Sequence, residues 1–292
     1  MLNKLTRIKF ILVILLFVVF FLKRNDLKDF FTNHNLETKQ ENSQVVVLNE
    51  KNKDKQKAIA KIGIILADIG LQKDVVEKSL NTNPKINIGV SAYADNLTTI
   101  TNESISQYHH TTMVLLPTQP ANYMKNDPGP LAMLIDSSIP ENARKFNDII
   151  SKLTSNEIGL YISPISTFPF KEEKAMSLLK LLEDYESKFK FFAYYDRDGA
   201  NLLTRLLSKS HISNKVITFN KIIDDSDPSA IVASLDDLGN MSISQNRTCI
   251  GIVAPKAKSV EIINEWLKKN SDKVELISIS DILKMREAKD HK

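Results

Sequence analysis

The chain has 292 residues, 42% of them hydrophobic, which is enough to bury one sizeable core. Its 39 basic and 35 acidic residues are mixed along the sequence and leave a net charge of +4. Because no stretch concentrates the basic charge that contact with a phosphate backbone requires, nucleic acid is not an expected partner.

The N-terminus contains an unbroken apolar block at residues 10–22, FILVILLFVVFFL, between Lys9 and the pair Lys23 and Arg24. As a helix this block rises about 20 Å, short of the ~30 Å hydrocarbon core, so a span requires Lys9 and Arg24 to snorkel. A secretory signal has the same layout, but no small-residue cleavage site follows, which favours an uncleaved anchor. Residues 1–24 are therefore predicted to be a membrane anchor or signal segment, with the rest of the chain exported.

Residues 25–57 are polar and charged, with the short island VVVL at residues 45–48 as their main apolar run. So little apolar surface does not support a folded unit, and this segment is predicted to be a polar linker.

Residues 58–285 are predicted to form one α/β domain, followed by a charged tail at residues 286–292. Its near-continuous apolar runs are typical of parallel strands covered on both faces. The expected strands are residues 62–67, 86–92, 112–116, 158–162, 189–195, 216–219, 249–253 and 274–279. Eight β-α steps predict a (β/α) barrel or distorted barrel, with an open doubly wound sheet as the alternative.

Helical patterns lie between these strands. Leu178 and Leu182 fall on one apolar face of an expected helix, and Val260 and Ile263 on a face of another. Two helix starts are also marked. Ser138 with Glu141 fits a capping box, and Asp227 before Pro228 fits an N-cap with proline in the first turn.

Parallel α/β proteins gather their chemistry at the C-terminal ends of the strands. The residues expected there are Asp68, residues 93–95, 117–119 and 163–166, Tyr195, Asp196, and residues 220–224 and 254–255. These positions hold carboxylates and hydroxyls but none of the five histidines. His109 and His110 precede an expected strand, which indicates structural or surface roles.

Six stretches resemble the divergent polysaccharide deacetylase family, bacterial relatives of the metal-dependent enzymes that remove acetyl groups from chitin-like glycans and peptidoglycan. They are KIGIILADIGL, HTTMVLLPTQP, YMKNDPGPLAM, NKIIDDSDPSAI, GIVAPKAKSVEIINEWL and VELISISDIL, and they cover about residues 59 to 284. The loop at residues 126–130, with Pro-Gly-Pro after Asp127, is the most specific of them. The resemblance implies a distorted (β/α) barrel, in agreement with the periodicity.

The resemblance also implies a catalytic site that this chain does not retain. The family opens with two aspartates, a base and a metal ligand, where this chain has Ala67 and Asp68. Three family histidines correspond to Leu115, Ser163 and Ala254, and Ile162 stands for the Asn of the Asn-His pair. The segment FFAYYDRDGAN is similar to the family's Asp-Ser-Arg stretch, with either Tyr195 or Asp196 at the Asp position.

The replacement of the family's metal ligands decides which cofactors we expect. A hydrolytic metal needs several convergent N or O ligands, which Asp68 alone does not supply. A remodelled site is the alternative, in which carboxylates such as Asp95, Asp127, Asp196 and Asp224 join Asp68 around a divalent ion. Cys249 is the single cysteine, which excludes an intramolecular disulfide and a cysteine-based zinc site. No G-x-G-x-x-G or Walker loop occurs, so no nucleotide is expected.

The sequence therefore predicts a single-pass protein of a bacterial inner membrane, anchored through residues 10–22, with its folded domain on the periplasmic side. We expect a non-catalytic module that binds an envelope glycan or an envelope protein, without catalytic residues or a cofactor. Its expected substrate-binding residues are Asp68, Asp127, Tyr195 and Asp196. The alternatives are an active metal-dependent deacetylase built around Asp68 and a structural envelope protein.

Overall fold

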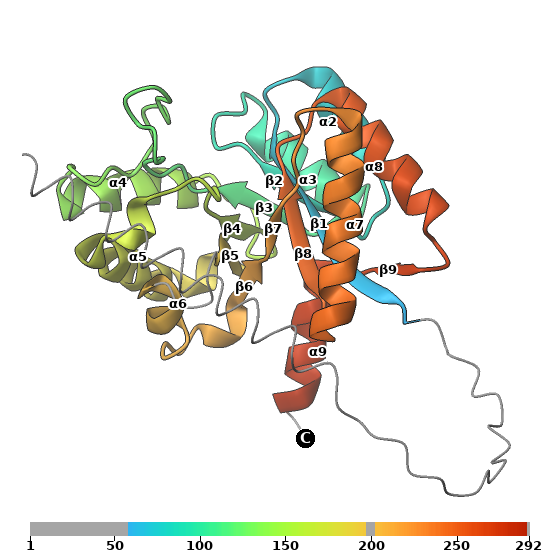
Figure 1. Ribbon diagram of the computed structural model, residues 1–292. Helices are drawn as coiled ribbons and strands as arrows, with labels where there is room; N and C mark the ends of the chain where they lie inside the picture. Colours follow the sequence, from blue (N-terminus) through green and yellow to red (C-terminus); the bar gives the residue numbers. More distant parts are fainter. Residues whose placement is uncertain (1–57, 197–201, 291–292) are drawn as a thin grey trace, which may run out of the picture. The chain divides into compact units, whose positions relative to one another are not determined.

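The computed structural model describes residues 58–196 and 202–290 (Figure 1). The predicted anchor and linker, residues 1–57, lie outside these ranges. Within them, no helix has the length and apolar character needed to cross a bilayer.

The strands of the described residues all pair in parallel. They are β1 (Ala60–Ile69), β2 (Asn87–Val90), β3 (Thr112–Leu115), β4 (Gly159–Tyr161), β5 (Phe192–Tyr195), β6 (Val216–Phe219), β7 (Lys221–Ile222), β8 (Cys249–Val253) and β9 (Val274–Leu276). Their order is β6-β5-β4-β3-β2-β1-β8-β7, and β9 pairs with the start of β1.

This order closes on itself because β6 and β7 are consecutive pieces of chain, with Asn220 between them. β6 pairs with β5 on one side, while β7 pairs with β8 on the other. The result is a near-closed parallel barrel of eight strands, which confirms the predicted (β/α) barrel and rejects the doubly wound alternative. The short strand β7 was not predicted, since two residues after an asparagine carry no apolar pattern.

The barrel interior is filled by alternate residues of the strands, as expected for inward-facing positions. They are Ile65, Ala67, Met113, Leu115, Tyr161, Phe191, Ala193, Ile217, Phe219, Ile250 and Ile252. Helix α9 (Ile279–Asp290) adds Ile279 and Leu283 to the same cluster, and so closes the end of the barrel at which the strands begin.

Helices pack against the outside of the barrel. They are α2 (Lys73–Leu80), α3 (Leu97–Ser106), α4 (Ile139–Ile150), α5 (Glu172–Asp184), α6 (Leu202–Leu207), α7 (Pro228–Gln245) and α8 (Ala257–Lys269), with one-turn 3₁₀ segments η2 (Phe168–Phe170), η3 (Glu186–Lys188) and η4 (Ser213–Lys215). The predicted apolar faces of α5 and α8 are confirmed, because Leu178, Leu182, Val260 and Ile263 are all buried.

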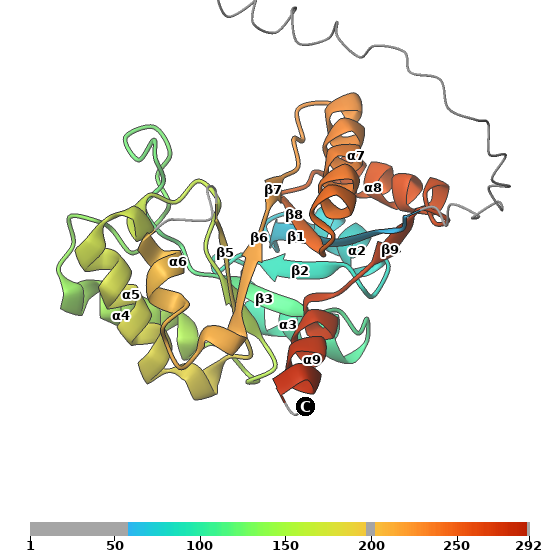
Figure 2. The same cartoon turned by 60° about the horizontal axis from the view of Figure 1, so that its bottom comes forward.

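These helices fall into two groups around the barrel. α4, α5 and α6 lie on one side, α2, α7 and α8 on the other, and β6 and β7 lie between α6 and α7 (Figures 1 and 2). Because β6 continues directly into β7, no helix follows β6 to cover its outer face.

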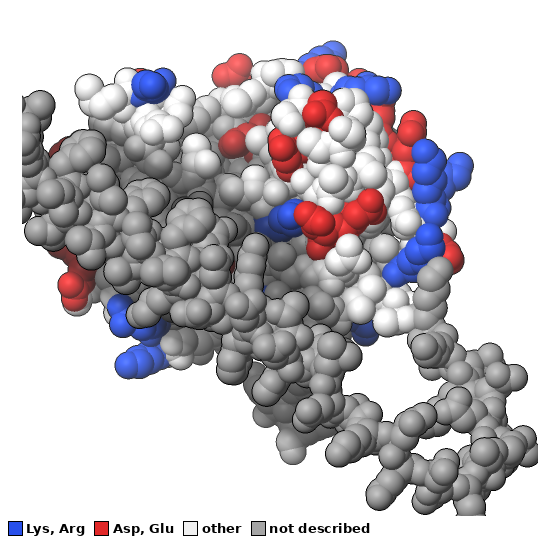
Figure 3. All heavy atoms as spheres, viewed as in Figure 1, with Lys and Arg blue, Asp and Glu red and all other residues white. Residues whose placement is uncertain are grey.

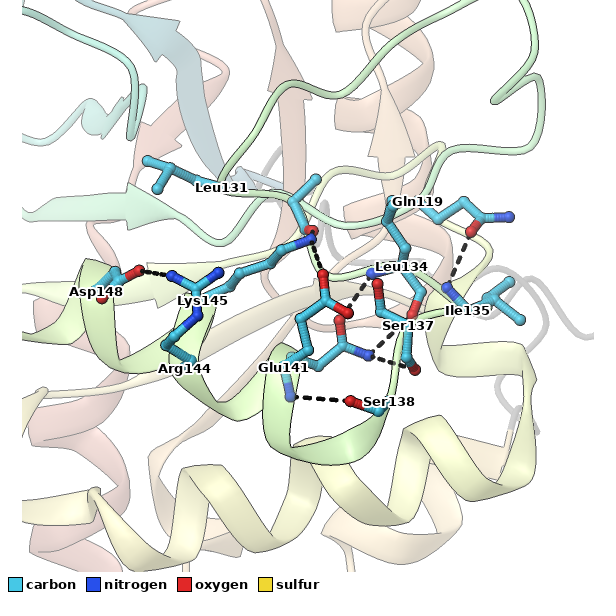
Figure 4. Close-up of polar contacts among 12 residues, drawn as sticks. Gln119, Leu131, Leu134, Ile135, Ser137, Ser138, Glu141, Arg144, Lys145 and Asp148 are labelled. Atoms are coloured by element: carbon cyan, nitrogen blue, oxygen red, sulfur yellow. Dashed lines mark hydrogen bonds and ion pairs between the residues drawn. The ribbon is translucent and has the colours of Figure 1, made fainter.

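Helix α4 is anchored at its start by polar contacts with the preceding loop (Figure 4). Ser138 Oγ accepts a hydrogen bond from the Glu141 N–H at 3.3 Å, which confirms the predicted N-cap. The reciprocal half of the capping box is absent among the described contacts, since the Glu141 carboxylate instead lies 3.4 Å from Lys145 Nζ. Asn142 donates to the Leu134 carbonyl at 2.8 Å and accepts from the Leu134 N–H at 2.9 Å.

The start of α7 is as predicted. Asp227 Oδ1 accepts hydrogen bonds from the Ser229 hydroxyl and from the N–H groups of Ala230 and Ser229, and these bonds lower the pKa of the Asp227 carboxyl. Positive and negative side chains are interspersed over the visible face of α7 and α8 (Figure 3). Two ion pairs reach these helices from other elements: Lys221 of β7 pairs with Asp237 of α7, and Lys78 of α2 pairs with Glu261 of α8.

Candidate functional site

Asp68 lies at the C-terminal end of β1, where the strand departs from regular pairing. The register between β1 and β2 shifts between Leu66 and Ile69. Asp68 has a φ of 55°, in the left-handed region that non-glycine residues rarely adopt. An irregularity of this kind re-aims a side chain at a barrel rim. Strain that the surroundings hold in place clusters at functional sites, which makes Asp68 the leading candidate of this barrel mouth.

Tyr161 of β4 holds Asp68 from inside the barrel. Its hydroxyl oxygen accepts a hydrogen bond from the Asp68 N–H at 3.0 Å. Burial raises the pKa of the Asp68 carboxyl above 3.8, and a hydrogen bond from the Tyr161 hydroxyl opposes this effect. Burial, followed by the charge of Asp68, raises the pKa of Tyr161 well above 10.0, so the phenol keeps its proton. One phenol therefore contacts both the backbone and the carboxylate of Asp68.

Space for Tyr161 comes from a glycine on β2. A Cβ added at Gly89 would lie 3.0 Å from carbons of the Tyr161 ring, which is tighter than ordinary contact. The ring is 1% exposed and belongs to the packed interior of the barrel. Sequence reasoning did not single out Tyr161, because an apolar run with one tyrosine is typical of core.

A cavity of about 210 Å³ opens beside Asp68, between the ends of β1 and β8. Ala67, Asp68, Val75 and residues 70–72 line one side, and residues 254–256 line the other. Lys256 is directed to Asp225, whose backbone carbonyl lies 3.1 Å from Lys256 Nζ. No Lys or Arg of the described residues forms an ion pair with Asp68, so the cavity holds one uncompensated carboxyl group.

Tyr195 is the last residue of β5, and Asp196 follows it directly. Tyr195 joins the interior cluster and stacks on Phe219, with ring centroids 5.8 Å apart and planes at 18°. Asp196 follows the strand, and its charge adds to the effect of burial that raises the pKa of outward-facing Tyr194 to about 12. Because successive side chains of β5 point to opposite faces, Tyr195 faces the barrel interior at the mouth and Tyr194 faces outward.

Asp127 lies on an exposed loop. Its Oδ1 accepts a hydrogen bond from the Gly129 N–H at 2.9 Å, in the local turn that Asp residues commonly form. Gly129 has a φ of 82°, and a Cβ there would lie 2.7 Å from the Tyr93 ring. The Tyr93 hydroxyl donates to the Pro128 carbonyl at 2.6 Å, which fixes the loop over that ring.

The four expected binding residues therefore do not form one bonded cluster. Within the described residues, no hydrogen bond or ion pair joins Asp68 to Asp127 or Tyr195. The carboxylates after β7 serve local structure: Asp224 accepts from the Ser226 N–H, and Asp225 accepts from the Ser259 hydroxyl.

The histidines near β3 lie at its N-terminal end, as expected. The His110 ring is buried, and its two nitrogens lie 2.9 Å from the carbonyl oxygens of Ile86 and Leu80. This histidine links the segments that precede β2 and β3, which is a structural role. His109 is exposed.

A family model described as divergent polysaccharide deacetylase matches residues 64–283. The chain belongs to the divergent polysaccharide deacetylase family. The match spans the barrel from β1 into α9 and includes Asp68 and the loop at Asp127. It confirms the resemblance that the sequence motifs indicate.

Solved structures share the fold of this divergent polysaccharide deacetylase. One is an uncharacterized protein, ATU2773, from Agrobacterium tumefaciens C58, with 18% identity, a TM-score of 0.63, and coverage of 77% of this chain and 89% of that one. Another is a putative cellobiose-phosphate cleavage protein, EF3048, from Enterococcus faecalis V583, with 11% identity, a TM-score of 0.53, and coverage of 77% and 99%. At these identities the likeness concerns the fold alone. No curated protein matches the chain.

The metal chemistry that the family resemblance implies does not fit the residues present. Of the corresponding positions, Leu115 is buried in the barrel interior, Ser163 is half-buried and Ala254 is exposed. Within residues 58–196 and 202–290, no three His, Cys, Asp or Glu side chains are grouped as metal ligands. We therefore derive no catalytic step through a metal.

Proposed function

We propose that this divergent polysaccharide deacetylase is a non-catalytic glycan-binding protein of the bacterial envelope. Its barrel is tethered to the inner membrane by residues 10–22 and linker residues 25–57, and faces the periplasm. A glycan end enters the mouth of the barrel, where Asp68 accepts hydrogen bonds from its hydroxyl groups. Tyr195, Asp127 and Asp196 contact the glycan further out.

One observation carries this proposal: Asp68 keeps a half-buried carboxylate on a strained backbone beside Tyr161, while the partners for a metal are replaced by Leu115, Ser163 and Ala254. Desolvation raises the pKa of this carboxyl, and carboxyl groups with such a shift at a barrel mouth are typical of functional sites. Hydrogen bonds from sugar hydroxyls to a carboxylate are of the strong, charge-assisted kind.

The size of the cavity supports an end group rather than an extended chain. Its volume of about 210 Å³ lies below the ~300–1,000 Å³ of pockets that enclose whole small molecules. The half-buried Tyr195 ring offers an apolar face with a polar tip, which suits a sugar ring.

The test measures binding and chemistry on the same samples. The full-length chain in detergent is incubated with peptidoglycan and with acetylated chito-oligosaccharides, with and without Zn²⁺, Mg²⁺, Mn²⁺ or Ca²⁺. We expect retention on one glycan without acetate release. Asp68→Asn is expected to weaken retention about tenfold, because an amide accepts more weakly than a carboxylate. Asp95→Asn, at an exposed position near the end of β2, is the matched control and is expected to bind normally.

Two outcomes contradict the proposal. Metal-dependent acetate release that disappears in Asp68→Asn establishes the alternative, an active deacetylase with a remodelled carboxylate site. Absence of retention on every glycan favours a structural role through protein partners. The anchor is tested separately by alkaline carbonate extraction, in which the full-length chain is expected to stay with the membranes and a chain lacking residues 1–24 to be released.

A further inference from the structure

An open groove of about 540 Å³ runs along the outer wall of the barrel, away from Asp68. Its floor is formed by Tyr194 and Leu207, which are buried, and by the half-buried Thr204, Val216 and Thr218. The exposed residues Ser208, Ser213, Asn214 and Arg286 form its rim. The groove thus combines residues from β5, β6, α6, η4 and α9.

The groove exists because the ring of helices is interrupted there. β6 passes through Asn220 into β7 without an intervening helix, and the described part of α6 is the short segment Leu202–Leu207. The outward side chains of β6, Val216 and Thr218, are consequently left half-buried rather than covered. Figures 1 and 2 both place β6 between α6 and α7.

One cation stands at the rim of this groove. The Arg286 guanidinium donates to the Val216 carbonyl at 2.6 Å through Nη1, and the remaining N–H groups of its planar fork have no protein acceptor among the described residues. None of those residues pairs a carboxylate with Arg286. Arg286 also lines a neighbouring cavity, and the carboxylates of that cavity, on Glu157, Glu186 and Glu287, do not line this groove.

The other polar side chains that line the groove carry hydroxyl groups or, at Asn214, an amide, and these groups both donate and accept hydrogen bonds. Within the described part of the chain, the side chains of Ser213, Asn214 and Thr218 make no hydrogen bond to protein. The Tyr194 hydroxyl donates to Thr204 Oγ1 at 2.8 Å, which fixes the floor. The described lining contains one guanidinium and several hydroxyls but no carboxylate.

We propose that this groove binds a hydroxyl-bearing anion of the kind that acidic saccharides present. Its carboxylate or phosphate pairs with the free N–H groups of Arg286, which match both oxyanions in a bidentate way. Its hydroxyl groups bond to Thr218, Ser213 and Asn214. This site is separate from the barrel mouth and does not depend on the function proposed for Asp68.

Calorimetry on the full-length chain tests this assignment with three probes. Glucuronate and glucose 6-phosphate carry the two oxyanions, and glucose is the neutral control. We expect one or both anions to bind, and added salt to weaken binding because the contact is ionic. Arg286→Gln is expected to weaken binding about tenfold or more, and Arg286→Lys less, since a lysine keeps the charge without the fork. Arg205→Gln, at an exposed position of α6 outside the groove, is the matched control.

Thr218→Val keeps the shape of the floor, removes one hydroxyl, and is expected to weaken binding by about threefold to tenfold. Asp68→Asn is expected to leave this binding unchanged, which separates the groove from the mouth. The proposal is overturned if neither anion binds, if glucose binds as tightly as the anions, or if Arg286→Gln and Arg205→Gln bind equally well. Preference for one anion identifies carboxylate or phosphate as the group that Arg286 recognises.

Discussion

Two features of Asp68 lower the stability of the folded protein. Its backbone occupies the left-handed region at φ 55°, and its carboxylate is largely withdrawn from water without a cation. Asp tolerates the left-handed region better than most residues, but the conformation still costs free energy. A residue that lowers stability at the mouth of a barrel is typical of a functional site, where activity is retained at the expense of stability.

These costs predict how stability responds to Asp68→Asn. Between pH 3.8 and its raised pKa, the folded carboxyl holds a proton that the unfolded chain has lost. The free energy of unfolding therefore falls as pH rises through that window. Asn has no such proton, so the variant is expected to exceed the wild type by ~1 kcal/mol at pH 7, a common size for stabilising substitutions.

Urea unfolding at pH 7 and near pH 4 checks this expectation, and the advantage of Asp68→Asn is expected to shrink at the lower pH. Asp95→Asn, which changes an exposed carboxylate, is the control and is expected to leave stability unchanged. A variant less stable than the wild type at pH 7 would show that the carboxylate stabilises the fold.

The sequence identified Asp68 but not its partner. A carboxylate at a strand end is visible in sequence, and the family motif adds weight to it. Tyr161 is the third residue of the buried run GLYI at residues 159–162, and its inward direction depends on the register of β4 in the barrel. The inward alternation of neighbouring strands is the signal that points to it. The sequence also predicts Asp127 and Asp196 as binding residues, whereas in the structure Asp127 forms a local turn.

At the scale of elements, apolar periodicity located the core strands because each is buried on both faces. It placed the fifth strand at residues 189–195, whereas β5 covers Phe192–Tyr195, since buried Phe189 and Phe191 continue the apolar run before the ladder begins. The polar contacts at the start of α4 agree with the sequence pattern only in part. Ser138 caps α4 as expected, but Glu141 turns to Lys145, whose Nζ also donates to the Ala132 carbonyl at 2.8 Å.

The loop before α4 depends on one buried amide. Asn142 is 1% exposed and satisfies both the N–H and the carbonyl of Leu134 (Figure 4). Asn142→Ala leaves both groups without partners and is expected to lower the free energy of unfolding by ~2–3 kcal/mol. Asn147→Ala, on the exposed side of the same helix, is expected to change it by less than ~0.5 kcal/mol. Equal urea midpoints for the two variants would contradict this role.

At the scale of the whole molecule, the barrel is completed where β6 continues into β7. Seven parallel ladders join neighbouring strands around the barrel, and the chain itself passes from β6 to β7 through Asn220. There the Asn220 N–H donates to the Ile250 carbonyl at 2.7 Å, and Asn220 Oδ1 accepts from the Ile250 N–H at 2.9 Å. A side chain thus supplies a bond that a strand backbone would otherwise make, which no periodicity reveals.

Closure of the barrel is therefore expected to depend on the acceptor at position 220. Asn220→Ala leaves the Ile250 N–H without a partner and is expected to cost ~1–3 kcal/mol, with faster hydrogen exchange at that amide. Asn220→Asp keeps an acceptor and is expected to retain slow exchange there. Asn240→Ala, exposed on α7, controls for loss of an asparagine. If Ile250 exchanges equally slowly in Asn220→Ala and in the wild type, the backbone ladders between β7 and β8 close the barrel without this side chain.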